Sequence, residues 1–176
     1  RVTLAAHLVM TGYGHWLPND LRGSGSAEIR KDELKKFGEI HRGRKRIQPS
    51  RDEIREFYQQ AEPALDHPVL WFDEAMRAAI GEAFEQVIRD RGYTCWACAI
   101  LRDHAHLLIR THKDRSNEMW NRFAEASKSS LRAIAQIARD HPIWSTRPCS
   151  VLLFSRPEVL TRIPYINGNP RKHKLP

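Results

Sequence analysis

The stretch Asp103-His104-Ala105-His106-Leu107-Leu108-Ile109 predicts a β-strand that carries two histidines on one face. Side chains of a strand alternate between its two faces, so His104 and His106 lie together while the apolar side chains at the intervening positions face the other way. Two imidazoles aimed at one point suit a divalent metal ion, although histidines in strands also occur as ordinary surface or core residues. The spacing makes His104 and His106 candidate metal ligands, and it leaves open the alternative that they are ordinary surface or core residues.

The segments around this strand predict an alternation of strands and helices. Apolar patterns indicate strands over residues 2–11, 93–101, 104–111 and 150–155. Helical spacing of apolar residues, together with N-cap and proline signals, indicates helices over residues 51–61, 73–90 and 117–140 and from Pro157 through Tyr165. The resulting order predicts an α+β fold of ferredoxin-like type, an antiparallel sheet with helices packed on one face.

The length of 176 residues is enough for one well-packed domain and short for two. A charge-dense segment near the amino terminus, from about residue 27 to residue 66, includes the basic run Arg42-Gly43-Arg44-Lys45-Arg46. We expect a single domain over residues 1–176, with the segment 27–66 as a charged insertion.

The formal net charge of +8 favours a polyanionic partner, of which nucleic acid is the simplest and an acidic membrane the lesser alternative. No apolar run approaches the length of a membrane span and the amino terminus shows no signal-peptide core, which predicts a soluble, cytoplasmic protein. Three cysteines argue against a disulfide framework. Cys95 and Cys98 are an odd number of residues apart in a strand, so we expect them on opposite faces, which disfavours a zinc knuckle.

A second informative stretch is Ile163-Pro164-Tyr165-Ile166-Asn167-Gly168-Asn169-Pro170. On a helix, Tyr165 and Asn169 are four residues apart and share a face. A tyrosine hydroxyl can attack phosphorus, and an amide oxygen can complete a metal site begun by two imidazoles. The structural alternative is that Tyr165 packs as a half-buried aromatic residue and Asn169 caps the helix before Pro170.

Both motifs together resemble the single-tyrosine His-hydrophobic-His transposases. The resemblance is greatest to the REP-associated tyrosine transposases, whose tyrosine lies in a Tyr-Ile-x-x-Asn-Pro motif, as Tyr165 to Pro170 does here. The amino-terminal stretch over residues 11–23 is also similar to one transposase-like branch. One departure is Pro164, which removes a backbone donor directly before the tyrosine and puts the orientation of Tyr165 in question.

This resemblance implies a metal-dependent single-stranded DNA endonuclease and strand transferase that acts on hairpin or repeat-bearing DNA. It implies Tyr165 as the nucleophile that forms a 5′-phosphotyrosine link, and His104, His106 and Asn169 as ligands of a divalent ion, Mg²⁺ or Mn²⁺. Two imidazoles favour Mn²⁺ by ligand softness. Asp103 is interpreted as a turn residue, with a contact to a ligating histidine as the alternative. The sequence leaves open whether the protein acts as a monomer or a homodimer.

The outward face of the helix over residues 117–140 carries Arg122, Lys128 and Arg132, which we expect to contact DNA phosphates. Arg42 to Arg46 is either a contact to a hairpin stem or a solvated loop. Exposed tryptophans are candidates for base stacking, although most tryptophans in a domain of this size are core residues. Trp16, Trp96 and Trp120 are the three considered.

The alternative function is a non-catalytic or domesticated nucleic-acid-binding protein on the same fold. An RNA-recognition module would place aromatic residues on its exposed strands, and the strand over residues 104–111 has none. A zinc nucleobase deaminase is excluded because it requires His-x-Glu followed by Pro-Cys-x-x-Cys. Metal-dependent cleavage separates the two remaining functions.

Overall fold

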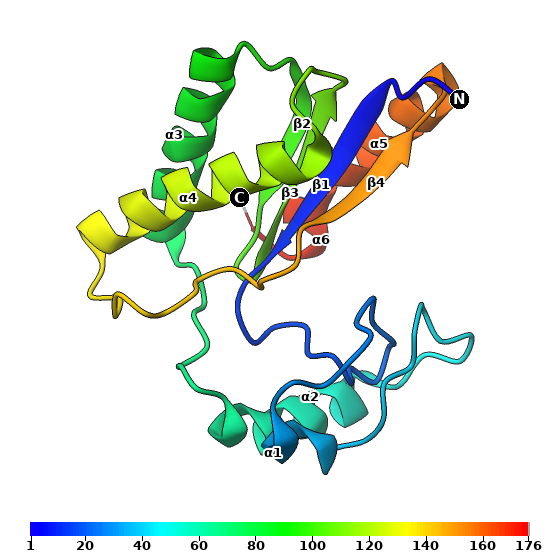
Figure 1. Ribbon diagram of the computed structural model, residues 1–176, viewed down its shortest axis with the longest axis vertical. Helices are drawn as coiled ribbons and strands as arrows, with labels where there is room; N and C mark the ends of the chain where they lie inside the picture. Colours follow the sequence, from blue (N-terminus) through cyan, green and yellow to red (C-terminus); the bar gives the residue numbers. More distant parts are fainter. Residues whose placement is uncertain (176) are drawn as a thin grey trace. The chain divides into compact units, whose positions relative to one another are not determined.

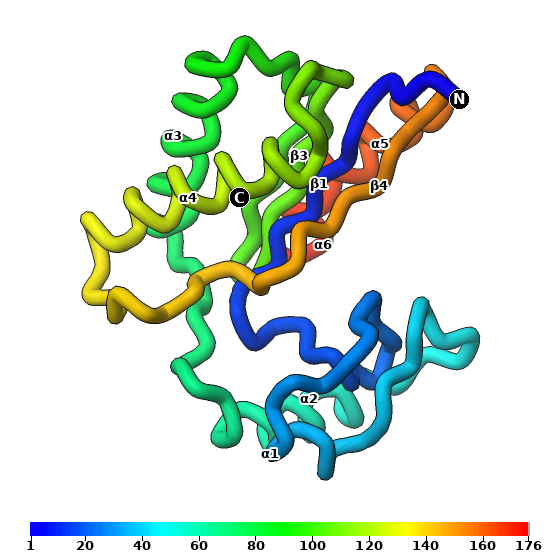
Figure 2. Tube along the Cα trace, in the orientation of Figure 1, coloured from blue at the N-terminus to red at the C-terminus, as the bar shows by residue number. Residues whose placement is uncertain are grey.

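Four strands form one antiparallel sheet in the order β2-β3-β1-β4 (Figure 1). These are β1 (Ala5–Thr11), β2 (Cys95–Ile100), β3 (His104–Arg110) and β4 (Cys149–Leu153). β1 lies between β3 and β4, with His7 opposite Leu108 on one side and opposite Val151 on the other, and the chain trace follows this arrangement (Figure 2). The order and the antiparallel pairing confirm the ferredoxin-like α+β class expected from the sequence.

The computed structural model describes residues 1–175, which divide into two compact units. One is the sheet unit, formed by Arg1–Gly12 and the chain from Leu70 onward. The other is the insert unit, formed by Tyr13–Val69, which is wider than the insertion expected over residues 27–66.

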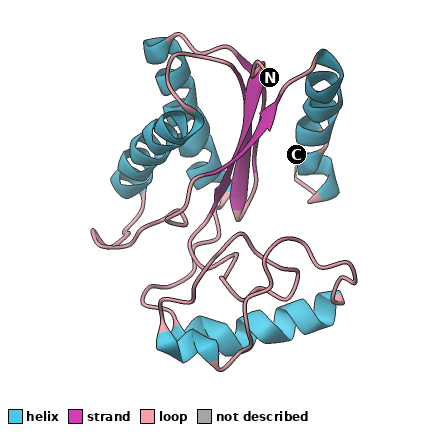
Figure 3. Ribbon diagram, turned by 45° about the vertical axis from the view of Figure 1, so that its right-hand side comes forward, coloured by secondary structure: helices cyan, strands magenta, loops and turns pink. Residues whose placement is uncertain are grey.

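Helices cover both faces of the sheet (Figure 3), and in this respect the expectation of helices on one face is wrong. The crossover helices α3 (Glu74–Arg91) and α4 (Ser116–Ile134) pack on one face, where the larger core contains Leu8, Met10, Phe84, Leu107, Phe123 and Leu131. On the opposite face, α5 (Arg156–Asn167) packs through a smaller core that contains Ala5, Ala97, Ala99, Leu108, Leu153, Val159 and Ile166. The physical reason is that β1, β2 and β3 carry apolar side chains on both faces, so both faces require cover.

The helix expected over residues 117–140 ends at Ile134, because the backbone of Ala135 is extended. The chain beyond it folds back and supplies core side chains without helical structure, among them Ile143 and Trp144, which are fully buried or nearly so. The indole nitrogen of Trp144 donates to the hydroxyl of Ser127 at 2.9 Å, which ties this segment to α4. No helix in the described chain, including the 19 residues of α4, is long and apolar enough to cross a bilayer.

β2 contains a bulge between Cys95 and Ala97, and this places the two thiols of the strand on one face. Cys95 is opposite Ile109 and Cys98 is opposite Leu107, and both of these partners belong to the larger core. The expectation that the cysteines face opposite ways is therefore wrong, because the bulge adds one residue to the alternation.

The insert unit has a small core of its own, made by Leu17, Leu34, Phe57 and Ala61. Its helical segments are α1 (Asp32–Lys35), α2 (Arg51–Ala61) and a 3₁₀ turn, η1 (Glu62–Ala64). α2 starts where the sequence predicts, since Ser50 and Glu53 form the reciprocal capping box.

Candidate active site

β3 directs His104 and His106 to the face of the sheet that α5 covers. Their ring centroids are 4.8 Å apart and the rings are nearly perpendicular, at 88°. Between them Ala105 is fully buried in the larger core on the other face. His106 itself is 5% exposed, so the pair combines one buried and one partly accessible imidazole. The alternation predicted from the sequence is confirmed.

The Nδ1 atom of each histidine has a protein partner. A carboxylate oxygen of Asp103 lies 2.6 Å from Nδ1 of His104, and Nε2 of His7 lies 3.0 Å from Nδ1 of His106. Asp103 thus makes the histidine contact that the sequence offered as its alternative role. A ligating histidine is usually oriented by a hydrogen-bond partner on its other ring nitrogen, most often a carboxylate, a backbone carbonyl or water. Here Asp103 and His7 take that position, which leaves Nε2 of both rings as the nitrogen available to a ligand.

The buried pair of His7 and His106 shares one hydrogen bond and is uncharged at neutral pH. Burial lowers the pKa of His7 to about 4, with a contribution from the charge of Arg162. Burial likewise lowers the pKa of His106 to about 3, with smaller contributions from the three neighbouring histidines and from Arg162. If Nδ1–H of His106 donates to Nε2 of His7, then Nε2 of His106 keeps its lone pair, and the proton of His7 sits on Nδ1.

That second nitrogen, Nδ1 of His7, is buried and has no hydrogen-bond partner among the described residues. An unpartnered buried donor costs free energy, and such costs are commonly found where function requires them. The sequence left His7 unassigned. The signal that could have found it is the pairing of β1 with β3, which puts His7 on the face of His106 but becomes visible only with the strand register.

Tyr165 lies on α5, above the histidines. The helix starts at a capping box formed by Ser155 and Glu158, with Pro157 in its first turn as expected. The ring centroid of Tyr165 is 6.0 Å from that of His106 and 6.3 Å from that of His7. Tyr165 is 51% exposed, so this residue lies at the surface of the site.

A cation that the sequence reasoning missed lies next to Tyr165. The guanidinium carbon of Arg162 is 5.5 Å from the centroid of the tyrosine ring. Arg162 precedes Tyr165 by three residues, so the helical spacing itself was the available signal.

Pro164 lies inside α5 and not at its start, and the helix continues past it to Asn167.

Asn169 lies just beyond α5, in α6 (Asn169–Lys172), and is 5% exposed. Its side-chain nitrogen donates to the backbone oxygen of Tyr165 at 2.8 Å, which fixes the amide and leaves Oδ1 as the candidate ligand atom. His173, which the sequence reasoning did not consider, follows α6, with its ring centroid 5.6 Å from that of His104. Within the described chain, no three side chains of His, Cys, Asp or Glu form a preformed metal site.

The three cations expected to contact DNA lie on α4, which packs on the other face of the sheet from His106 and Tyr165. Each already bonds within the protein. The ammonium of Lys128 is 2.9 Å from Glu125, and Arg132 donates to the backbone oxygens of Arg139 and His141. Their role as a DNA face stays a prediction, and the structure does not bring them together with the histidine and tyrosine site.

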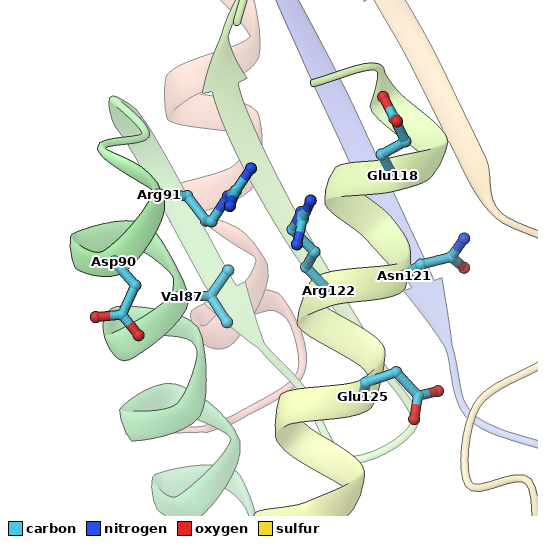
Figure 4. Close-up of a pocket in the computed structure, with 7 residues that line it drawn as sticks. All are labelled: Val87, Asp90, Arg91, Glu118, Asn121, Arg122 and Glu125. Carbon is cyan, nitrogen blue, oxygen red and sulfur yellow. The ribbon is translucent and has the colours of Figure 1, made fainter. Parts of the chain in front are cut away.

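Arg122 lines a shallow depression of about 560 Å³ between α3 and α4 (Figure 4). It meets Arg91 there, and both cations bond the carboxylate of Asp114, at 3.2 Å and 3.0 Å. The hydroxyl of Tyr93 donates to the same carboxylate at 2.6 Å. These bonds make Asp114 the centre of a structural network that joins α3, α4 and the end of the hairpin.

The network predicts an acid-sensitive contribution to stability. Hydrogen bonding from Tyr93, and then from Arg91, lowers the pKa of Asp114 to about 2. Because the unfolded state binds the proton at higher pH than the native state does, the stabilisation is complete above about pH 5 and is lost as the pH falls toward 2. Asp114→Asn should be less stable than wild type at neutral pH, and the difference should shrink on acidification. Urea unfolding at pH 7, 4 and 2.5 measures this, and a pH-independent difference would contradict it.

Comparison with known proteins points to one fold. No family model matches the chain, and no curated protein matches it. Among solved structures, a REP-associated tyrosine transposase bound to a REP hairpin is similar over 98% of this chain and 72% of that chain, with a TM-score of 0.50 and 14% identity. A putative transposase from Deinococcus radiodurans is similar over 96% of this chain and 92% of that chain, with a TM-score of 0.44 and 11% identity. The chain therefore has the fold of the REP-associated tyrosine transposase, the family that its two motifs resemble.

Proposed function

We propose that this protein cleaves and rejoins single-stranded DNA, with Tyr165 as the nucleophile and hairpin or repeat-bearing DNA as the substrate. The observation that carries the proposal is the gathering of His104, His106 and Tyr165 on one face of the sheet, with 6.0 Å between the rings of Tyr165 and His106. The REP hairpin bound by the similar structure and the net charge of +8 support the choice of substrate.

The chemistry is a transesterification. The hydroxyl oxygen of Tyr165 forms a bond to the scissile phosphorus, the bond from phosphorus to the 3′ oxygen breaks, and that oxygen takes a proton to become a 3′-hydroxyl. The tyrosine proton leaves to solvent, and the guanidinium of Arg162 lies beside the tyrosine ring, where a cation can contact the phosphate under attack. Because a phenolate is a better leaving group than an alkoxide, a second 3′-hydroxyl can reverse the step and join strands without a nucleotide cofactor.

The residues present fit the divalent ion that the resemblance implies, Mg²⁺ or Mn²⁺. His104 and His106 have Nε2 available because Asp103 and His7 occupy the other nitrogens, and Asn169 offers a fixed amide oxygen. These three residues would hold the ion. When bound, it would polarise the scissile phosphate and stabilise charge on its oxygens.

The test is a denaturing gel of 3′-labelled, hairpin-bearing single-stranded DNA incubated with the wild-type protein and Mn²⁺. A substrate pool is required because the recognised sequence is not specified by these residues. We expect a slow-migrating band that protease removes, since the 3′ fragment carries the 5′-phosphotyrosine link. DNA binding without any adduct would reject catalysis and favour the non-catalytic binding protein.

His7 gives a prediction of its own, as a positioning residue for His106. We expect His7→Leu to weaken Mn²⁺ binding by roughly 10- to 100-fold, the usual effect of losing the partner of a ligating histidine. His7→Gln can still accept the Nδ1–H of His106 through its amide oxygen and should restore most of the affinity. Calorimetry measures the affinity, and ¹⁵N NMR of His106 reports its tautomer. Unchanged Mn²⁺ affinity in His7→Leu would reject the positioning role.

A further inference from the structure

Trp16 presents an immobilised aromatic ring on the surface of the insert unit. Its side chain is 44% exposed, and its indole nitrogen donates to the backbone oxygen of Gly23 at 3.0 Å. The guanidinium carbon of Arg22 is 3.7 Å from the ring centroid, which is the distance of a stacked cation. The ring thus has one contact that fixes its plane, one cation packed against it, and a solvent-exposed remainder.

A buried carboxylate fixes the cation as well. Arg22 donates to both oxygens of Asp20, at 2.9 Å and 2.7 Å, and the side chain of Asp20 is fully buried. The hydroxyl of Tyr58 donates to the same carboxylate. Trp16 and Arg22 are therefore held in place before any ligand arrives, so binding on the ring would cost little side-chain entropy.

A second segment of the insert unit lies against the one that carries Trp16 and Arg22. It is a turn with four cations, Arg42, Arg44, Lys45 and Arg46, which we call the basic turn. Backbone hydrogen bonds join the two segments: Ser24 to His41 at 2.9 Å, Gly43 to Ser24 at 2.8 Å, and Lys45 to Arg22 at 2.9 Å. Gly23 permits this approach, because its φ is +97° and a Cβ at that position would lie 1.9 Å from the oxygen of Gly43.

The cations of the basic turn form no ion pair with any described residue. Four other cations of the insert unit are neutralised, since Arg30 pairs with Glu28, Lys31 with Asp66, Lys35 with Asp32, and Arg55 with Asp52. An unneutralised cluster beside a fixed, exposed indole combines the two features that bind single-stranded nucleic acid, a stacking platform and a positive track for the backbone.

We propose that Trp16 and the basic turn form a single-stranded DNA-binding site, in which one unpaired base stacks on the indole and the flanking phosphates contact the four cations. Bases within a duplex already stack on each other, so an exposed ring selects an unpaired base. The choice of DNA over RNA rests on the proposed function. The site itself belongs to the insert unit and uses none of the groups assigned to strand cleavage.

The test measures binding of a fluorescein-labelled dT oligonucleotide by anisotropy, with every variant made in a Tyr165→Phe background so that no covalent product forms. Trp16→Ala should weaken binding by about 5- to 150-fold, the range for loss of one stacked base, and should leave the salt dependence unchanged. Trp16→Phe should keep most of the affinity. Trp71→Ala, which removes another exposed indole, is the matched control and should bind like the background protein.

A second experiment tests the phosphate contacts with a double variant that carries both Arg44→Ala and Arg46→Ala. Losing two phosphate contacts should reduce the slope of log affinity against log salt by about 1.4. Lys35→Ala with Arg55→Ala removes the same charge from ion-paired positions of the same unit and should change the slope far less. A photocrosslink from 5-iododeoxyuridine should map to the peptide that contains Trp16.

The proposed site would be rejected if Trp16→Ala bound DNA with wild-type affinity. It would also be rejected if the two double variants showed equal slopes of log affinity against log salt. Competition by blunt duplex DNA as strong as by dT would overturn the preference for single strands, and tighter binding of oligo-U would overturn the choice of DNA. The covalent adduct is scored separately with protein that retains Tyr165. If the adduct forms but Trp16→Ala does not change the DNA affinity, only this inference is rejected. If Trp16→Ala weakens DNA binding but no adduct forms, only the proposed strand cleavage is rejected.

Discussion

Tyr165→Phe is expected to abolish the covalent protein–DNA adduct completely while leaving DNA affinity within a few-fold of wild type. The change removes one oxygen, the only atom of that side chain that can form a bond to phosphorus. The side chain is half exposed, and its hydroxyl makes no hydrogen bond to the part of the protein that the structure describes. Folding should therefore be unaffected, because no buried partner is left unsatisfied.

The matched control is Tyr93→Phe, which also removes one phenolic oxygen. That hydroxyl bonds Asp114 at 2.6 Å, so this variant should lose stability and keep the adduct. Mass spectrometry of protease-treated adduct from the wild type should find the nucleotide on the peptide of Tyr165. Adduct formed by Tyr165→Phe at the wild-type rate would end the assignment of the nucleophile.

The local features of the site follow from the sequence because they depend on short-range periodicity. The two-residue period of β3 places His104 and His106 on one face whatever the rest of the chain does. Pro157 likewise marks the first turn of α5. These predictions needed no knowledge of which elements pack together.

The long-range features could not be predicted in the same way. His7 meets His106 across 99 positions of sequence, through a strand register that the pattern of either strand alone does not determine. The face that α5 covers depends on apolar side chains distributed over four strands. The bulge in β2 inserts one residue into the alternation, and nothing in the composition of residues 95–98 indicates it.

The outward cations of α4 show a third feature that the sequence alone could not predict, namely which charged side chains already have partners within the protein. Spacing alone puts Arg122, Lys128 and Arg132 on the outside of α4, but charge patterning does not reveal which cations already have partners. All three make bonds within the protein, at 3.2 Å or less in the contacts that the structure gives. Phosphate binding by these residues would therefore exchange an existing bond for a new one, whereas the cations of the basic turn form no ion pair with any residue that the structure describes.

His106→Ala should remove both Mn²⁺ binding and the adduct, and it should also destabilise the fold. The loss of function follows if this imidazole is one of only two nitrogen ligands. The loss of stability follows from geometry, because His106 is 5% exposed and is the hydrogen-bond partner of buried His7. Its removal leaves His7 with both nitrogens unpartnered, at a cost of about 1–3 kcal/mol in the free energy of unfolding.

The two effects can be separated with His106→Gln, whose amide nitrogen can still donate to Nε2 of His7. This variant should recover much of the stability measured by urea unfolding and little of the Mn²⁺ affinity measured by calorimetry. His112→Asn is the control for loss of a histidine near the end of β3, since asparagine can replace the contact that His112 accepts from the backbone of Asp114. Mn²⁺ affinity retained in His106→Ala would remove His106 from the ligand set, and the adduct assay on the same protein would then show whether strand cleavage needs that ligand at all.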